Sequence, residues 1–313
     1  MILSASRRTD IPSYYSKWFF NRIKEGYVLV RNPMNYHQVS RINISPDVTD
    51  GIVFWTKNPS RMLERLGELD DYSYYFQFTL TPYGDDVEPG LPSKRSVIIP
   101  SFLELARRVG PRRVIWRYDP ILINEKYTVE RHMRYFEMLA CILADSTEKC
   151  VISFVDQYRN ISSAMRRLGV KEVSADEMHL IARHFSDTAG KHGMTVYACA
   201  EAENLEKWGV KKAHCIDPEL LGELAGYTIS AGKDKNQRAE CGCAESIDIG
   251  AYNSCRNLCE YCYANHSLSG IERNIRLHDP KSPMLIGNVE EGDRIAERKV
   301  KKVGDGQMEM RWE

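Results

Sequence analysis

The segment GIVFWTKNPSRMLERLGELDDYSYYFQFTL, residues 51–80, contains the pattern that decides the fold. It opens with a short apolar and β-branched run, Gly51–Thr56, and closes with a second such run, Tyr72–Leu80. Between them Asn58 and Pro59 form a helix-start signal, and apolar residues at helical spacing follow. A strand, a helix and a strand in this order predict a parallel pair, because parallel strands need a crossover connection.

The same alternation extends over residues 1–228. The runs that we expect to form strands are Ile2–Ser6, Tyr27–Arg31, Gly51–Thr56, Tyr72–Leu80, Arg113–Tyr118, Cys150–Val155, Thr195–Ala200 and Lys212–Ile216. Helix signals between them include starts at Thr128, at Ser174 with Glu177, and at Asp217–Pro218. The sequence therefore predicts an α/β fold, a (β/α)8 TIM-like barrel over 1–228, with an open doubly wound sheet as the alternative. Residues 229–313 are expected to form a Cys-rich cap and a charged tail.

Composition and charge exclude several classes of protein. With 43% hydrophobic and 27% charged residues, the 313-residue chain is neither disordered nor a small disulfide scaffold. Its 43 basic residues balance 43 acidic ones, so bulk charge favours neither a nucleic-acid nor a membrane partner. The sequence lacks an apolar run of about 18 residues, and its N-terminus, MILSASRRTD, differs from a signal peptide. We expect a cytoplasmic protein.

Nine cysteines in a cytoplasmic chain argue against a disulfide framework. Three of them, Cys255, Cys259 and Cys262, have the spacing C-x3-C-x2-C, which suits a [4Fe–4S] cluster with one iron left open. A further set could form a second Fe–S cluster or a zinc site; its members are Cys199, Cys215, Cys241 and Cys243. The alternative for Cys199 and Cys215 is a structural role as small buried hydrophobes.

Charged residues gather where the expected strands end, which is the edge that carries the active site in barrel enzymes. They are Arg7, Arg8, Asp10, Arg31, Lys57, Arg117, Asp119 and Glu201. Several arginines and a lysine favour a small anionic substrate, and the carboxylates would orient it or move protons. The alternative is that Arg7 or Arg117 only pairs with Asp10 or Asp119 at the rim.

The loop Cys255-x3-Cys259-x-Tyr261-Cys262 resembles the cluster-binding motif of radical S-adenosylmethionine enzymes. In that family S-adenosylmethionine chelates the open iron through its amino and carboxylate groups. An electron from the cluster then cleaves S-adenosylmethionine to a 5′-deoxyadenosyl radical. The resemblance implies a [4Fe–4S] cluster, S-adenosylmethionine, an electron donor and a barrel fold, with Tyr261 at the cofactor site; we place Arg31 there too. The family's loop follows the first barrel strand, whereas this loop follows the eighth, which a closed barrel would place beside the first.

The wider sequence resembles the uncharacterised DUF1848 family, whose C-terminal cysteines have been compared with the radical S-adenosylmethionine cluster. The segments that carry the resemblance are Ser4–Pro12 (SASRRTDIP), Val53–Pro59 (VFWTKNP), Trp116–Pro120 (WRYDP) and Cys241–Ala264. Because a family name supplies no reaction, function has to be argued from the site.

These observations favour an Fe–S enzyme that generates a radical on a small anionic substrate at the barrel mouth. One alternative is a zinc-stabilised barrel hydrolase or lyase, in which the clustered cysteines are structural. Another is a non-enzymatic Fe–S sensor or nucleic-acid-binding protein, which the balanced charge disfavours.

Overall fold

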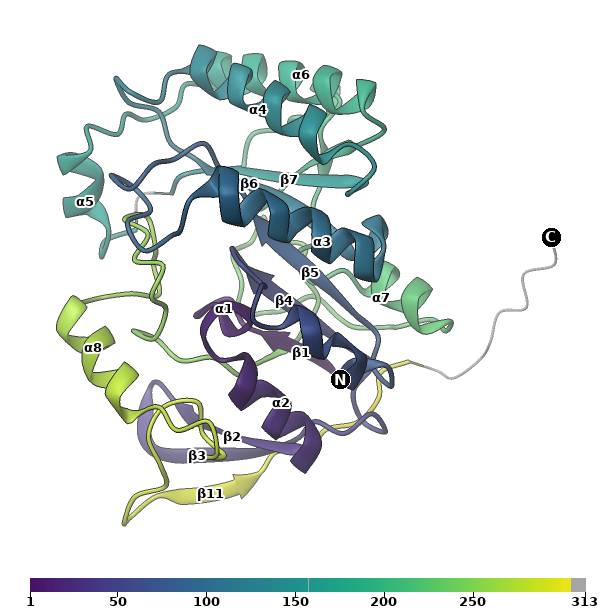
Figure 1. Ribbon diagram of the computed structural model, residues 1–313, viewed down its shortest axis with the longest axis vertical. Helices are drawn as coiled ribbons and strands as arrows, with labels where there is room; N and C mark the ends of the chain where they lie inside the picture. The colour runs from purple at the N-terminus through teal and green to yellow at the C-terminus, as the bar shows by residue number, and fades with distance from the viewer. Residues whose placement is uncertain (157, 305–313) are drawn as a thin grey trace.

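An eight-stranded parallel sheet is the centre of the computed structural model, which describes residues 1–156 and 158–304. Gln157 and residues 305–313, the end of the expected charged tail, lie outside the described residues. The strand order is β10-β1-β4-β5-β6-β7-β8-β9. Figure 1 labels the central run of this sheet from β1 to β7. The bounds are β1 Ile2–Ala5, β4 Gly51–Thr56, β5 Tyr74–Thr79, β6 Val114–Ile121, β7 Lys149–Phe154, β8 Thr195–Ala198, β9 Lys211–Lys212 and β10 Ile247–Asp248.

The parallel sheet confirms the α/β class, but its hydrogen bonding does not close into a barrel. Within the described residues the edge strands β9 and β10 pair with β8 and β1 and not with each other. The strand next to β1 comes from Ile247–Asp248, inside the segment expected to be the cap. The C-x3-C-x2-C loop therefore follows a strand that lies directly beside β1.

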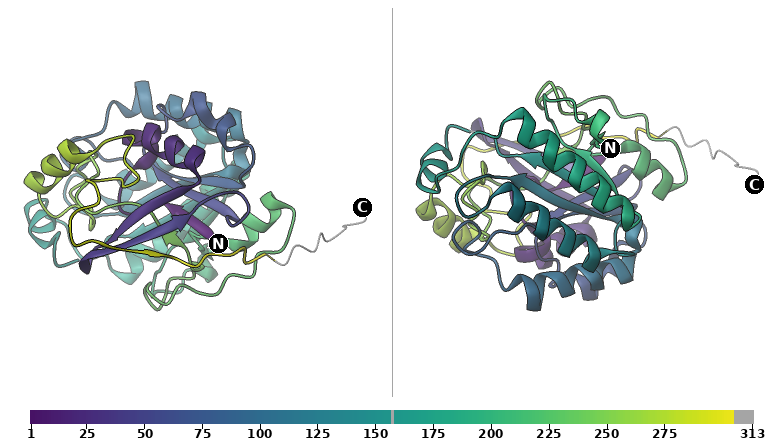
Figure 2. Two further views of the ribbon diagram at one scale, coloured as in Figure 1. Left: turned by 90° about the horizontal axis from the view of Figure 1, so that it is seen from below. Right: turned by 90° about the horizontal axis from the view of Figure 1, so that it is seen from above.

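The strand expected at Tyr27–Arg31 belongs to a different sheet, which corrects the prediction. Strand β2 (Tyr27–Asn32) pairs antiparallel with β3 (Asn35–Asn43), and β11 (Arg294–Glu297) pairs with β3. Only Pro33 and Met34 separate β2 from β3. A connection this short permits an antiparallel hairpin and excludes a parallel neighbour. The three-stranded sheet lies at the opposite end of the molecule from α4 and α6 (Figures 1 and 2).

Three helices begin where their capping signals predict. Thr128 caps α4, Ser174 and Glu177 form a capping box at α6, and Asp217 caps α7. The helix expected from Asn58 is instead the 3-10 segment η1 (Leu63–Leu69). The remaining bounds are α1 Ile11–Tyr14, α2 Ser16–Glu25, α3 Ile99–Val109, α4 Val129–Leu143, α5 Ser162–Arg167, α6 Ala175–Lys191, α7 Pro218–Ala225 and α8 Leu268–Leu277, with short turns η2 Lys94–Ile98, η3 Pro111–Arg113 and η4 Glu206–Trp208.

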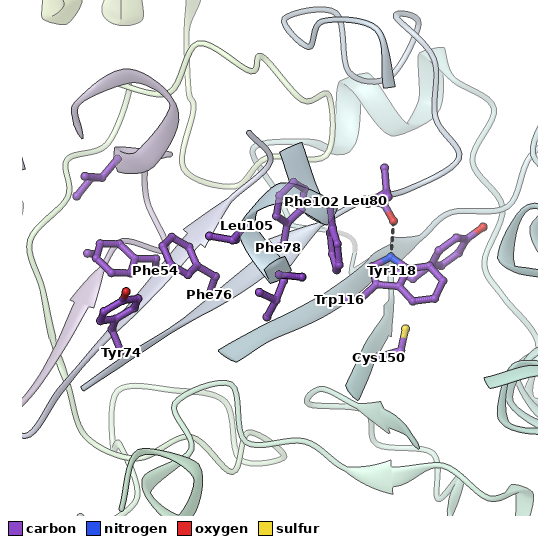
Figure 3. Close-up of a cluster of buried hydrophobic side chains, with 14 of the residues drawn as sticks. Phe54, Tyr74, Phe76, Phe78, Leu80, Phe102, Leu105, Trp116, Tyr118 and Cys150 are labelled. Atoms are coloured by element: carbon purple, nitrogen blue, oxygen red, sulfur yellow. Dashed lines mark hydrogen bonds between the residues drawn. The ribbon is translucent and has the colours of Figure 1, made fainter. Parts of the chain in front are cut away.

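The two faces of the main sheet are covered differently. Alternate side chains such as Phe76 and Trp116 pack with the helices α3, α4 and α6. Figure 3 shows this cluster, in which the Trp116 indole donates a 2.9 Å hydrogen bond to the Leu80 carbonyl. The opposite face, including Tyr75, packs against α7 and the segment that carries Cys241. None of the described helices has both the length and the hydrophobicity needed to cross a membrane.

Candidate functional site

A cavity of about 640 Å³ opens at the carboxyl ends of the main-sheet strands. Because parallel strands all end at this edge, residues distant in sequence meet there. Of the predicted charged residues, Arg7, Arg8, Asp10, Lys57, Arg117 and Asp119 line it. So do Tyr261 and all of the cysteines predicted as ligands: Cys199, Cys215, Cys241, Cys243, Cys255, Cys259 and Cys262.

The three loop cysteines lie between β10 and α8. The Cys255 residue is buried, and Cys259 and Cys262 are partly accessible. Burial raises the pKa of the Cys259 thiol to about 12, although the Lys57 ammonium opposes this shift. Among the described residues, no three His, Cys, Asp or Glu side chains converge as they would around a single metal ion. The loop thiols therefore line one cavity without sharing one ion-sized position.

Backbone contacts hold this loop against residues 84–91. The amide of Gly90 donates to the Asn257 carbonyl at 3.0 Å, and the amide of Glu260 donates to the Val87 carbonyl at 2.9 Å. A Cβ at position 90 would lie 2.0 Å from the Arg256 carbonyl oxygen, so only glycine allows this approach. The main chain between Cys255 and Cys259 is thus fixed by a second, distant loop.

A buried ionic network holds the same loop from its side chains. The Lys57 ammonium donates to Glu88 at 2.7 Å and to the Tyr261 hydroxyl at 2.8 Å. Tyr261 also donates to Glu88, and Lys94 forms an ion pair with the same carboxylate. Burial alone would raise the pKa of Glu88, but Lys57 and Lys94 lower it to about 2. Glu88 is therefore a buried anion held between two cations, and Tyr261 joins this pair to the cysteine loop.

Asp10 forms the other link between the sheet and the loop. Its carboxylate accepts hydrogen bonds from the Lys57 amide at 2.8 Å and the Ser13 amide at 3.0 Å. It also accepts from the Thr56 hydroxyl at 2.8 Å and the Asn257 amide group at 3.0 Å. Burial raises the pKa of Asp10, and these hydrogen bonds oppose the rise. With four partners, Asp10 is a structural anchor rather than a free proton carrier.

The two neighbouring arginines of the first strand end differ in their pairing. Arg8 forms an ion pair with Asp248 at 2.9 Å, and burial would raise the pKa of Asp248 but Arg8 keeps it low. Arg7 lies over the Trp55 ring, 5.2 Å from its centroid, and is 4.0 Å from Asp234. Its buried Nη2 has no hydrogen-bond partner within the described part of the chain. Arg7 therefore retains a donor at the cavity.

Arg117 is fully engaged within the cavity wall. It donates to Asp119 through Nε at 2.9 Å and through Nη2, and to the Gln77 side-chain Oε1 at 3.3 Å. Its Nη1 also lies 2.9 Å from the Cys215 sulfur. Burial would lower the pKa of Arg117, but Asp119 and Cys215 raise it well above its usual value. The rim pairing weighed from the sequence is present here.

Two predicted residues are absent from the cavity lining. Glu201 accepts a 2.8 Å hydrogen bond from the Phe154 amide, and burial raises its pKa to about 7. Arg31 lies in β2 of the small sheet, where it forms a bidentate ion pair with Asp293 at 2.6 and 2.7 Å. Arg31 therefore lies outside the cavity lining, and the cofactor role expected for it stays a prediction.

Sequence reasoning missed several residues that shape the site, including Glu88, Gly90 and Asn257. Glu88 and Gly90 lie in an irregular loop whose sequence gives no periodic signal. Asp248 lies in one of the segments that carry the family resemblance, but no role was predicted for it. Its strand, β10, has only two residues and is hard to recognise in the sequence.

One family model matches residues 2–264, and its description is domain of unknown function (DUF1848). The chain belongs to the DUF1848 family. The DUF1848 match ends just past Cys262, so it contains every cysteine of the cavity. It stops before α8 and β11. No curated protein matches the chain.

Proposed function

We propose that this DUF1848 protein is an Fe–S enzyme in which Cys255, Cys259 and Cys262 hold a [4Fe–4S] cluster facing the cavity. The open iron would take a small chelating ligand, for which S-adenosylmethionine is the candidate, and a small anionic substrate would bind beside Arg7. An external electron donor is required as a partner. The observation that carries the proposal is that the loop thiols and the unpartnered Arg7 donor line the same cavity.

The loop residues fit such a cluster. Each of three irons takes one thiolate, so the sulfurs do not need to converge on one point as they would around a single ion. Gly90 and Asn257 fix the loop backbone, and Lys57 places a cation near Cys259. When bound, the cluster would supply single electrons to a ligand on its open iron.

The chain's own residues would then bind and orient the reactants. The free Nη2 of Arg7 would donate to a carboxylate or phosphate, and its guanidinium would remain stacked on Trp55. The Lys57–Glu88–Tyr261 network would hold the loop at a fixed position beside the end of β4. The distance between the cluster and a substrate in the cavity would then stay constant. Lys57 and Glu88 are buried, so little water would reach the ionic network behind the loop.

Anaerobic purification tests the proposal directly. We expect at least about four irons and four sulfides per chain, and formation of 5′-deoxyadenosine after reduction with S-adenosylmethionine. The variant Cys262→Ser should lose this product, whereas Cys141→Ser, at an exposed position on α4, should retain it. Absence of sulfide in the wild-type protein would contradict the proposal. Formation of 5′-deoxyadenosine by the Cys262→Ser variant would also contradict it.

A further inference from the structure

A second group of cysteines lies on the wall of the cavity formed by the ends of β8 and β9. We call it the wall group; its members are Cys199, Cys215, Cys241 and Cys243. The sulfurs of Cys199 and Cys215 are 3.0 Å apart. Cys243 lies close enough to Cys215 and to Cys241 for the members of each pair to alter one another's pKa, so the four sulfurs lie one beside the next. Three segments that are separate in the sequence supply these four cysteines, so their meeting depends on the tertiary fold.

The backbone under Cys199 and Cys215 is fixed by the sheet. The Cys199 amide donates to the Ile152 carbonyl at 2.9 Å, continuing the β7–β8 pairing. The Cys215 carbonyl accepts from the Tyr75 hydroxyl at 2.6 Å and from the Gln77 side chain at 3.0 Å. These two sulfurs therefore project from positions that main-chain and buried side-chain hydrogen bonds define.

The Cys241-Gly242-Cys243 segment is attached beside them. The His214 ring is 2.6 Å from the Gly242 carbonyl oxygen. A Cβ at position 242 would lie 2.9 Å from the His214 ring, so the segment approaches as closely as glycine permits. Just beyond Cys243, the Ala244 amide donates to the Ile216 carbonyl at 3.1 Å. The fold thus brings the C-x-C pair to the end of β9 with little freedom in its main chain.

Two cations, Arg117 and Arg7, lie beside the wall group. Arg117 Nη1 lies 2.9 Å from the Cys215 sulfur, and the Arg7 guanidinium lies close enough to Cys243 and Cys215 for their charges to interact. The facing anion is Asp119, which is paired with Arg117. If the cysteines were only small buried hydrophobes, their neutral thiols would be weak hydrogen-bond acceptors for these cations. Sulfurs bound to a metal as thiolates would instead carry negative charge that the two guanidinium groups offset.

From these contacts we propose that Cys199, Cys215, Cys241 and Cys243 form a four-thiolate metal centre, separate from the cluster of the 255–262 loop. The ligand chemistry suits a zinc ion or an Fe–S cluster, and either one bound by four thiolates carries a net negative charge that Arg7 and Arg117 offset. The sulfurs lie one beside the next and do not converge on one point. In a four-thiolate Fe–S cluster each sulfur binds a different iron, so the sulfurs do not need to converge on one point. A zinc ion would require the cysteine side chains to turn about their Cα–Cβ bonds over the fixed backbone. The proposal does not depend on S-adenosylmethionine chemistry.

The experiment compares metal content in matched variants. The loop variant replaces Cys255, Cys259 and Cys262 by Ser, the wall variant carries Cys199→Ser and Cys215→Ser, and Cys141→Ser is the control. Zinc, iron and sulfide are counted per chain after anaerobic purification. We expect the loop variant to keep one zinc, or a second complement of iron and sulfide, which the wall variant loses. The metal that remains in the loop variant shows whether the wall group binds a zinc ion or an Fe–S cluster.

A cobalt titration keeps the test valid if the wall variant folds poorly. In the loop variant stripped of metal, Co²⁺ should produce the visible absorption of tetrahedral thiolate ligation, and prior alkylation of the thiols should abolish it. A loop variant that holds no metal and gives no cobalt band would overturn the proposal. A Cys199–Cys215 disulfide in the anaerobically purified protein, found by peptide mapping, would also overturn it. Loss of the loop cluster alone would instead count against the proposed function.

Discussion

The two thiol-bearing sides of the cavity are built by different means. On the loop side, buried ions hold Cys255–Cys262 through Lys57, Glu88 and Asp10. On the wall side, the sheet holds Cys199 and Cys215 through main-chain hydrogen bonds and the Tyr75 hydroxyl. The loop therefore depends on charges that a single substitution can unbalance, whereas the wall depends on the fold as a whole. This difference predicts which changes release one side without the other.

The largest effect is expected from Lys57→Met, which removes one of the two cations on Glu88. Removing one partner from a buried ion pair typically costs about 3–5 kcal/mol, and because Lys94 remains we expect about 3 kcal/mol, measured by urea unfolding. The loop should also lose iron, because Tyr261 loses its Lys57 contact. The control Lys149→Met removes a more exposed pair with Asp217 and should cost less than about 1 kcal/mol. Equal losses in both variants would contradict the ionic account of the loop.

A smaller effect separates the two arginines that follow β1. Arg8→Gln deprives the buried Asp248 of its ion pair and should lower the free energy of unfolding by about 1.5–3 kcal/mol. Arg7→Gln should cost only about 0.5–1 kcal/mol, because it removes mainly a stacking contact with Trp55. Denaturant unfolding of both variants checks this order. A larger loss in Arg7→Gln would mean that Arg7 is a structural residue and not a donor for substrate.

Gly90→Ala tests the close approach under the loop. The new methyl group would meet the Arg256 carbonyl, and overpacking of this kind costs about 1–3 kcal/mol. Iron content should fall while the wall group keeps its metal. Gly190→Ala in α6 is the matched control, because a Cβ added there would meet no atom within 4 Å and the change should be neutral or slightly stabilising. Unchanged iron in Gly90→Ala would show that the loop tolerates displacement.

The smallest effect lies outside the cavity, in the helices behind the sheet. Burial lowers the pKa of His132 to about 4 from 6.5, so the unfolded chain binds this proton more readily than the folded one. The stability that His132 contributes is therefore complete above about pH 6.5 and falls as the pH is lowered toward 4, by about 1 kcal/mol between pH 7 and 5.5. Glu201, whose pKa burial raises to about 7, changes stability in the opposite direction over this range, so the His132 contribution is read as the difference between the wild-type and His132→Gln unfolding profiles. Identical pH profiles for the two proteins would contradict the assignment to His132.

The sequence allowed the main sheet to be predicted well where the alternation of strand and helix was long and regular. Capping residues such as Thr128 and Ser174 marked helix starts correctly, because capping depends on local hydrogen bonds. The hairpin at Pro33–Met34 was missed, since an apolar run alone does not distinguish a parallel strand from an antiparallel one. Strand β10 was missed because it has only two residues and its position is set by pairing with β1.

For the site, sequence patterns indicated residue types but not their partners. The strand-end rule brought Lys57, Arg117 and Asp10 to one cavity, because it depends only on the direction of parallel strands. It did not reveal that Arg117 is occupied by Asp119, or that Lys57 is held by Glu88 from an irregular loop. Those pairings depend on tertiary contacts between segments that have no shared sequence signal.

Electron paramagnetic resonance of the anaerobically reduced protein, with and without S-adenosylmethionine, would test the proposed open iron more directly than any other experiment. We predict a reduced [4Fe–4S] signal that changes when S-adenosylmethionine is added, because one iron lacks a cysteine ligand. This S-adenosylmethionine-sensitive signal should disappear in Cys262→Ser, whereas a signal from a cluster on the wall group would remain. A signal that is unaffected by S-adenosylmethionine, or a protein that holds zinc and no cluster, would contradict a cluster with an open iron on the 255–262 loop.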